Sequence, residues 1–165
     1  MQITGGLRED NTKYTLRFVY PQALSTGEAT GFGDSNENSA VVLLDYHNCK
    51  TLFMGDAPAA VEEQILLESG LGILQKSGLD LSGTDILKVS HHGSGNATTA
   101  AFLEYLGVQD AVISCGEGNL YGHPDAGTLQ RLNEAGVTTH RTDREGTIVV
   151  TIDQNGHYTI TKNKS

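Results

Sequence analysis

The chain has 165 residues and a formal net charge of −9, and 38% of its residues are hydrophobic. This length and apolar content predict one folded globular domain and exclude a disordered chain, and no apolar run approaches the about 20 residues of a membrane span. The acidic charge argues against a broad basic surface for a nucleic-acid backbone, whereas it suits a site that attracts cations.

The first part of the chain has the patterns of strands followed by one helix. In chain order, the patterns predict a strand over 14–21, a long loop over 22–38, a buried strand over 39–47, a turn at 48–50, a strand over 51–55 and a helix over 57–69. Pro58 is expected in the first turn of that helix, where its missing N–H group costs nothing.

Strands and helices alternate in the second part of the chain. The patterns predict strands over 85–90, 110–116 and 137–143, helices over 98–107 and 125–136, and a terminal hairpin with strands over 146–153 and 157–162. Mixed strands followed by strand–helix alternation predict an α/β domain in which helices cover sheet faces. The two cysteines, Cys49 and Cys115, lie in apolar strand-like contexts and are expected to be buried free thiols.

Two polar motifs follow predicted strands in the middle of the chain. Asp56 ends the second strand of the first hairpin, and the adjacent His91 and His92 end the strand at 85–90. If these strands are parallel neighbours, the three side chains meet at one edge of the sheet, and aspartate with neutral imidazole suits zinc, manganese or iron. The alternatives are a helix N-cap for Asp56 and a capping pair in a loop for the histidines.

A third polar loop follows the strand at 110–116. It offers Asn119, Tyr121 and His123, and Asp125 is expected to cap the next helix. An amide and an imidazole there suit contact with an anionic oxygen, although a plain turn built from Gly, Asn and Pro explains the same residues. Three such loops after three strands favour a functional site.

The remaining histidines carry weaker signals. His47 beside a turn and His157 in the terminal hairpin are expected to have no special role. His140 and Arg141 alternate along a short strand, so either Arg141 faces an anion or both belong to a solvated strand edge.

Three motifs in this order resemble the metallo-β-lactamase-like domain of the ComEC family of competence DNA-uptake proteins. They are "GDA" at 55–57, "HHGS" at 91–94 and "YGHP" at 121–124, within a resemblance that runs from about residue 38 to residue 150. The resemblance implies an αββα sandwich with metal ligands clustered at one edge. It implies a domain that uses Zn or Mn to hydrolyse DNA or another phosphodiester.

The resemblance also implies roles for individual residues. Asp56 is similar to the family's metal-bridging carboxylate, and His92 to its last histidine ligand. His91, Asn119 and His123 then belong on the substrate side of the centre. Within a ComEC-like protein, the chain would lie on the extracytoplasmic face of the membrane as a soluble part, and residues 1–14 lack the pattern of a signal peptide.

The family's H-x-H-x-D-H motif does not occur in the 165 residues. We therefore expect residues 1–165 to form a single domain that is only the C-terminal portion of the metallo-β-lactamase-like fold. Half of such a sandwich exposes a sheet face or edge, so we expect self-association or pairing with a missing N-terminal half. The alternative to a hydrolase is an inactive remnant that serves as a binding or assembly module.

Overall fold

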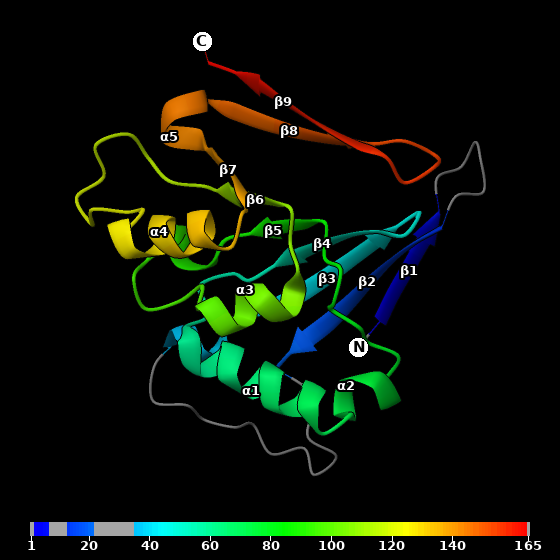
Figure 1. Cartoon of the computed structure of the whole chain (residues 1–165). Coiled ribbons are helices and arrows are strands. Elements are labelled where there is room, and N and C mark those ends of the chain that lie inside the picture. The colour runs from blue at the N-terminus through cyan, green and yellow to red at the C-terminus, as the bar shows by residue number, and fades with distance from the viewer. Residues whose placement is uncertain (1, 7–12, 22–34, 165) are drawn as a thin grey trace.

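The structure, a computed structural model, describes residues 2–6, 13–21 and 35–164, and it is built around a seven-stranded sheet. The strands lie side by side in chain order, which confirms the expected α/β class (Figure 1). They are β1 (Gln2–Gly6), β2 (Lys13–Tyr20), β3 (Val41–Tyr46), β4 (Cys49–Phe53), β5 (Ile86–Lys88), β6 (Asp110–Ile113) and β7 (Thr138–Arg141). Most of the predicted loop at 22–38 falls outside the described residues.

The sheet changes from antiparallel to parallel pairing at its centre. Strands β1 to β4 pair antiparallel, whereas β4 to β7 pair parallel, with Thr51 opposite Ile86 and Ile86 opposite Asp110. Parallel neighbours need crossover connections, and here helices supply them. The carboxyl ends of β4, β5 and β6 therefore lie at one edge of the sheet.

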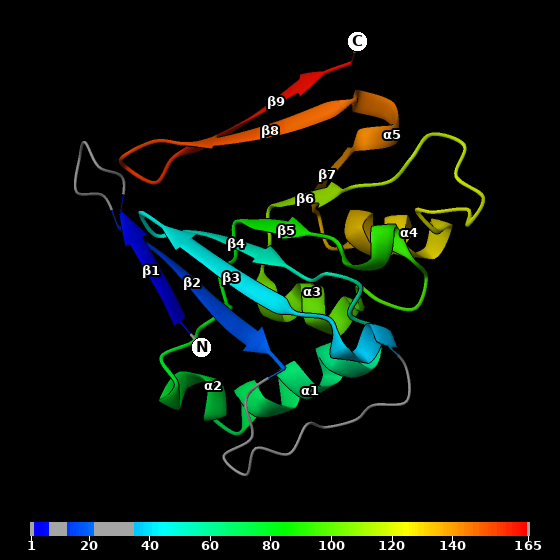
Figure 2. The same ribbon diagram turned by 180° about the vertical axis from the view of Figure 1, so that it is seen from behind.

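Helices cover one face of the sheet. Figures 1 and 2 show α1, α3 and α4 on the same side of the strands, with the terminal hairpin on the other side. The helices are α1 (Ala59–Gly70), α2 (Ile73–Lys76), α3 (Ala100–Leu106), α4 (Ala126–Glu134) and α5 (Thr142–Glu145). Two 3-10 turns also occur, η1 (Ser35–Asn38) before β3 and η2 (Ser90–Gly93) between β5 and α3. Among the described residues, no helix is long and apolar enough to cross a membrane.

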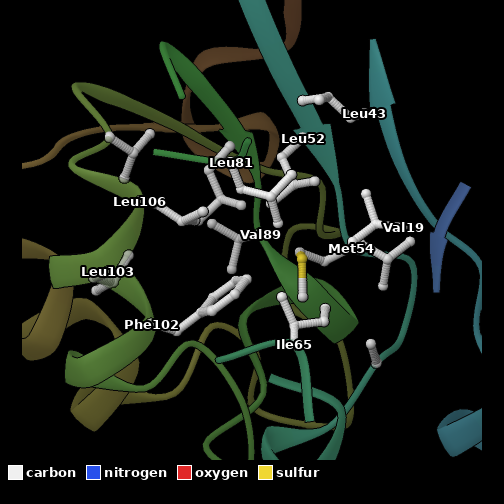
Figure 3. Close-up of a cluster of buried hydrophobic side chains, with 14 of the residues drawn as sticks. Val19, Leu43, Leu52, Met54, Ile65, Leu81, Val89, Phe102, Leu103 and Leu106 are labelled. Carbon is white, nitrogen blue, oxygen red and sulfur yellow. The ribbon is translucent and has the colours of Figure 1, made fainter. Parts of the chain in front are cut away.

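The hydrophobic core lies between the sheet and these helices. Alternate residues of the central strands point toward the helices, so Leu52 and Leu87 are buried there. Figure 3 shows Phe102 of α3 beneath Val89, with Met54 and Ile65 beside it. Phe102 is 1% exposed, so the packing of α3 fixes the end of β5 that leads into the two histidines.

The terminal hairpin, β8 (Thr147–Ile152) with β9 (Tyr158–Asn163), covers part of the second sheet face. An apolar groove of about 310 Å³ lies between hairpin and sheet, lined by Leu44, Thr51, Phe53, Ile86, Lys88, Val112, Ile148, Val150 and Ile152. The Tyr158 hydroxyl donates to Asp110 Oδ2 over 2.7 Å, and Lys162 Nζ lies 2.6 Å from Glu145 Oε1. The first contact ties the hairpin to β6 of the main sheet, and the second ties it to α5.

The first hairpin turn lies one residue earlier than the sequence predicts. Tyr46 pairs with Cys49, so the turn is His47–Asn48 and β4 already begins at Cys49. Both turn residues have positive φ, 53° and 64°, as two-residue hairpin loops of this twist require, and asparagine tolerates that conformation well. The prediction of a turn at 48–50 is wrong because it overlooked this two-residue loop.

Several smaller expectations also change. Pro58 is the N-cap of α1 instead of a residue in its first turn, and the short elements β1, α2 and α5 were not predicted. Cys49 is buried and free as expected, whereas Cys115 is free but only partly buried. Cys115 is partly exposed because β6 ends at Ile113 and Cys115 lies in the loop that follows. Its Sγ lies 3.3 Å from Asp143 Oδ1.

His140 is buried, so the alternative of a solvated strand edge is wrong. It is 7% exposed, and its Nε2 lies 2.7 Å from Asp110 Oδ1. Arg141 does not face an open anion site, because its guanidinium makes two hydrogen bonds to Asp143, at 3.0 and 2.6 Å.

Candidate functional site

The three polar loops identified in the sequence meet at one edge of the sheet. The backbone N–H of His91 donates to the Gly55 carbonyl over 3.0 Å, which joins the loop after β5 to the loop after β4. The N–H of Asp125 donates to the Gly93 carbonyl over 2.8 Å, which joins the loop after β6 to the same place. The predicted convergence of these loops on parallel strands is therefore confirmed.

The doubled histidine lies in an unusual backbone conformation. His91 has φ 42° and ψ 49°, and His92 has φ 55° and ψ 22°, so both residues are left-handed inside η2. Each non-glycine residue in this region costs of order 1 kcal/mol or more, and such conformations cluster at functional sites. The two imidazoles of this turn lie just after the end of β5, with ring centroids 6.3 Å apart and an angle of 64° between their ring planes.

Gly93 allows the histidine loop and the loop at 116–125 to pack closely. A Cβ atom on Gly93 would lie 2.6 Å from Cβ and 3.1 Å from Cα of Pro124, and the residue has φ +84°. Both the contact and the backbone angle exclude a larger residue without a shift of the chain. Gly93 thus sets the spacing between the histidines and His123.

The ring of His92 is oriented by the backbone just after β6. Its Nδ1 lies 2.6 Å from the carbonyl oxygen of Ser114, which can only accept a hydrogen bond. Nδ1 therefore carries the proton in the neutral ring, and Nε2 keeps its lone pair. That Nε2 faces Asp56, 4.0 Å from its Oδ1, and both side chains are about half exposed, at 52% and 46%.

Asp56 is not the N-cap of the following helix. The N-cap of α1 is Pro58, whose side chain makes no capping hydrogen bond. The backbone N–H of Asp56 donates to Ser39 Oγ over 3.2 Å, which holds the residue at the sheet edge with its carboxylate toward His92. Asp125 does cap its helix as predicted, since Oδ1 accepts from the Gly127 N–H at 2.8 Å.

The ring of His91 lies beside that of His123. The two ring centroids are 5.7 Å apart, at an angle of 65°. The Nδ1 atom of His91 is buried and has no hydrogen-bond partner within the part of the chain that the structure describes. A buried polar atom of this kind calls for a partner that a bound group or solvent would supply.

Asn119 closes the loop that carries His123. Its amide nitrogen donates to the carbonyls of Gly116 and His123, at 2.9 and 2.6 Å, and its Oδ1 accepts from the His123 N–H at 3.0 Å. The plain-turn alternative therefore describes its present contacts, and its predicted contact with substrate stays a prediction. A pocket of about 220 Å³ opens beside this loop, lined by His92, Cys115, Gly116, Asn119, Tyr121 and His123.

The site holds two candidate metal ligands and not a complete set. Asp56 and His92 face each other with the donor atoms that zinc or manganese prefers. Across residues 2–6, 13–21 and 35–164, however, no group of three or more His, Cys, Asp and Glu side chains is placed to hold a metal ion. Catalytic zinc sites have three protein ligands, so these residues do not fit a full metal centre.

Two charged residues that were not singled out from the sequence, the buried Glu62 and the partly buried Arg131, support the segment that follows the histidine loop. The Glu62 carboxylate accepts from the N–H groups of Thr98 and Thr99, at 2.6 and 2.8 Å, and burial raises its pKa. Arg131 donates to the carbonyls of Thr98 and Ala97, at 2.8 and 2.9 Å. Helices α1 and α4 thus clamp residues 97–99 from two sides.

Lys88 is a further charged residue near the site that sequence reasoning missed. It ends β5, and its Nζ donates to the Val89 carbonyl over 2.7 Å. Burial lowers its pKa, while the nearby Asp56 carboxylate acts in the opposite direction. The sequence signal that could have found Lys88 is a lysine that interrupts an otherwise apolar strand.

Curated proteins similar to this chain include bacterial competence proteins. ComE operon protein 3 of Bacillus subtilis (strain 168) is 30% identical over 121 residues, 73% of this chain and 14% of that protein. Competence protein ComA of Neisseria gonorrhoeae is 26% identical over 74% of this chain and 16% of its own length. Recombination protein 2 of Haemophilus influenzae is 29% identical over 72% of this chain and 14% of its own length.

The chain thus corresponds to about a seventh of the length of these relatives. No protein-family model matches the sequence.

Proposed function

We propose that this chain has a competence-related role and contributes one half of a metal-dependent phosphodiesterase centre that acts on DNA or another phosphodiester. The similarity to a competence protein supports the role. The convergence of Asp56, His91, His92 and His123 at one sheet edge supports the hydrolytic site. The fold in this proposal is the C-terminal portion of an αββα sandwich.

The observation that carries the proposal is the orientation of His92. The Ser114 carbonyl fixes the proton on Nδ1, so Nε2 presents its lone pair toward the Asp56 carboxylate. A histidine that donates its other ring N–H to a backbone carbonyl is the usual arrangement of a metal-binding histidine. A surface histidine without a ligand-binding role does not require a hydrogen bond that fixes its tautomer.

Each residue has a defined part in the proposal. Asp56 and His92 supply two ligands, and Zn or Mn is the metal that suits them. His91 and His123 lie on the side where an anionic oxygen of the substrate would approach, and Asn119 holds His123 in place. The remaining ligands come from polypeptide outside the described residues, which in a ComEC-like protein lies on the extracytoplasmic face of the membrane.

The second candidate function is a binding or assembly module without catalysis. The observation that favours it is the lack of a third metal ligand next to Asp56 and His92 within the described ranges. In that case the loops at the sheet edge keep their form while hydrolysis is lost.

A reconstitution assay separates the two functions. Hydrolysis of bis(p-nitrophenyl) phosphate with Mn²⁺ or Zn²⁺ is measured for the chain alone and for the chain joined to an H-x-H-x-D-H segment of a ComEC-type protein. We expect little turnover from the chain alone and metal-dependent turnover from the joined protein. Turnover should be lost in Asp56→Ala and His92→Ala and kept in His157→Ala, whose side chain is exposed on the distant hairpin.

Two results would overturn the hydrolase proposal. One is a folded, metal-loaded joined protein with no turnover, which favours the binding module. The other is turnover that survives both Asp56→Ala and His92→Ala, because the reaction would then use a different site.

A further inference from the structure

Tyr121 is an aromatic side chain presented to solvent on the rim of the candidate site. Its side chain is 85% exposed, and the neighbouring Leu120 is fully exposed. One face of the tyrosine ring stacks on His123, with ring centroids 6.0 Å apart and an angle of 17° between the planes. The opposite face of the ring is open to solvent and available to a planar ligand, since aromatic rings pair in offset-stacked arrangements.

The loop that carries Tyr121 is held in one shape. The three hydrogen bonds of Asn119 close the backbone between Gly116 and His123. The contact of Gly93 with Pro124 fixes the following residue against the histidine loop. Figure 1 shows this connection from β6 to α4 as a long loop at the end of the sheet. Little ordering cost therefore opposes binding at Tyr121.

The position of the ring connects it to the proposed reaction site. Tyr121, His123 and His92 line the same pocket of about 220 Å³. A base stacked on the outer face of Tyr121 therefore lies beside the pocket that this ring shares with His92 and His123.

The charge of the chain also favours stacking over contacts to phosphates. The net charge is −9, and the cations near the site are already engaged: Arg141 by Asp143, and Arg131 and Lys88 by backbone carbonyls. A nucleic acid that binds here gains little from counterion release. Stacking of an unpaired base on an aromatic side chain is the recognition mode that remains, and it is tolerant of sequence.

We propose that the outer face of Tyr121, backed by His123, is a stacking platform for one unpaired nucleobase of a single-stranded DNA whose backbone passes His92. The inference rests on the proposed function, because it names how the substrate of that site is held. Both faces of a base inside a duplex are covered by its neighbours, so the platform selects single strands over duplexes.

The test is binding of a fluorescein-labelled oligodeoxythymidylate, followed by fluorescence anisotropy in EDTA at low salt. We expect Tyr121→Ala to weaken binding by roughly 5- to 150-fold, the range for loss of one base stack. Tyr121→Phe keeps the ring and should bind like the wild type. Leu71→Ala, which removes another exposed apolar side chain on the helical side, is the control and should also bind like the wild type.

The oligonucleotide can be varied as well as the protein. An oligonucleotide of the same length with abasic sites keeps the phosphates and removes the bases, and we expect it to bind the wild-type chain as weakly as the intact strand binds Tyr121→Ala. A duplex of the same length should bind weakly too.

Three results would overturn the stacking platform. They are absence of saturable binding by the wild type, equal affinity of wild type and Tyr121→Ala, and equal affinity for intact and abasic strands. Because EDTA removes any metal, these results do not depend on hydrolysis. Failure of the metal centre alone would leave the binding difference at Tyr121 in place.

Discussion

At the scale of single residues, the site depends on side chains whose neighbours fix them. The Ser114 carbonyl selects the tautomer of His92, and Gly93 sets the distance between the histidine loop and Pro124. Neither contact follows from sequence spacing, because both join segments about 20 or 30 residues apart through the parallel pairing of β5 and β6. Tertiary packing therefore sets both the tautomer of His92 and the spacing of the two loops.

Gly93→Ala should destabilise the protein more than another glycine substitution with similar φ. At Gly93 the new Cβ meets Pro124 and the backbone is left-handed, so we expect the free energy of unfolding to fall by about 2–4 kcal/mol. Gly118→Ala is the matched control. Gly118 has φ +64°, but a Cβ added there meets no atom of the described residues within 4 Å, so its free energy of unfolding should fall by only about 1 kcal/mol. Urea unfolding measures both, and equal losses would contradict the close contact at Gly93.

Glu62 should make the stability of the folded protein depend on pH. Burial raises its pKa above the ordinary 4.5, so the folded state binds the proton more tightly than the unfolded state. The stability linked to this proton is fully present below pH 4.5 and is lost as the pH rises through the higher folded pKa. The difference in unfolding temperature, wild type minus Glu62→Gln, should therefore increase as the pH falls from neutral.

The Gln variant serves as the reference because it stays neutral at every pH. Other carboxyl groups, such as Asp80 and Asp143, have lowered pKa values and act in the opposite direction in both proteins. Thermal unfolding followed by circular dichroism gives the difference. A difference that stays constant or shrinks on acidification would show that Glu62 does not bind its proton more tightly in the fold.

At the scale of elements, the terminal hairpin covers a sheet face that the helices leave open. Tyr158 joins it to the Asp110–His140 pair, and Lys162 joins it to Glu145. At the hairpin turn, a Cβ on Gly156 would lie 2.2 Å from the His47 carbonyl oxygen, so the two hairpin turns touch. The hairpin is thus attached along its length and not only by its covalent connection.

Tyr158→Phe should loosen the hairpin without unfolding the core. It removes one hydrogen bond to a carboxylate, which contributes about 1.5–3 kcal/mol. We expect amide hydrogen exchange in β8 and β9 to become faster, while that in β4 stays close to wild type. Thr159→Ser, on the same strand with an exposed side chain, is the control. Equal exchange in Tyr158→Phe and wild type would show that the hydroxyl does not hold the hairpin.

Helices and strands with strong hydrophobic patterns in the sequence were predicted best. Apolar runs and helix ends predicted β2, β3, α3 and α4 well, since burial and capping are local signals. The turn at His47–Asn48 was misplaced because its two-residue loop chemistry was overlooked. The buried pair of His140 with Asp110 and the clamp by Glu62 were missed because tertiary neighbours decide both. For the site, strand ends predicted which residues meet, whereas the tautomer of His92 and the exposure of Tyr121 required the structure.

At the scale of the whole molecule, the two faces of the sheet differ. One face carries α1, α3 and α4, while the other is covered in part by two strands, with an apolar groove between. Phe53 in that groove is 40% exposed, and Val149 on the hairpin is 47% exposed. An open apolar sheet face of this kind supports the expectation of self-association or of pairing with further sheet from elsewhere.

Light scattering at micromolar concentration tests the expected self-association. We expect the wild-type chain to have the mass of a dimer or larger species, and Phe53→Ser to shift it toward the monomer. Leu71→Ser changes a residue that is 62% exposed on the helical side and should leave the mass unchanged. A strictly monomeric wild type would contradict the expectation.

The most direct test of the central claim, that Asp56 and His92 form part of a metal centre, is a zinc titration followed by histidine-selective ¹⁵N NMR. We predict that the apo protein shows His92 with its proton on Nδ1, and that Zn²⁺ shifts its Nε2 resonance before those of the other histidines. Asp56→Ala should abolish that preference. His157, which lies 3.5 Å from Asp153 with its side chain 81% exposed, is the internal control for weak surface binding. A His92 resonance that shifts no earlier than that of His157 would contradict the account.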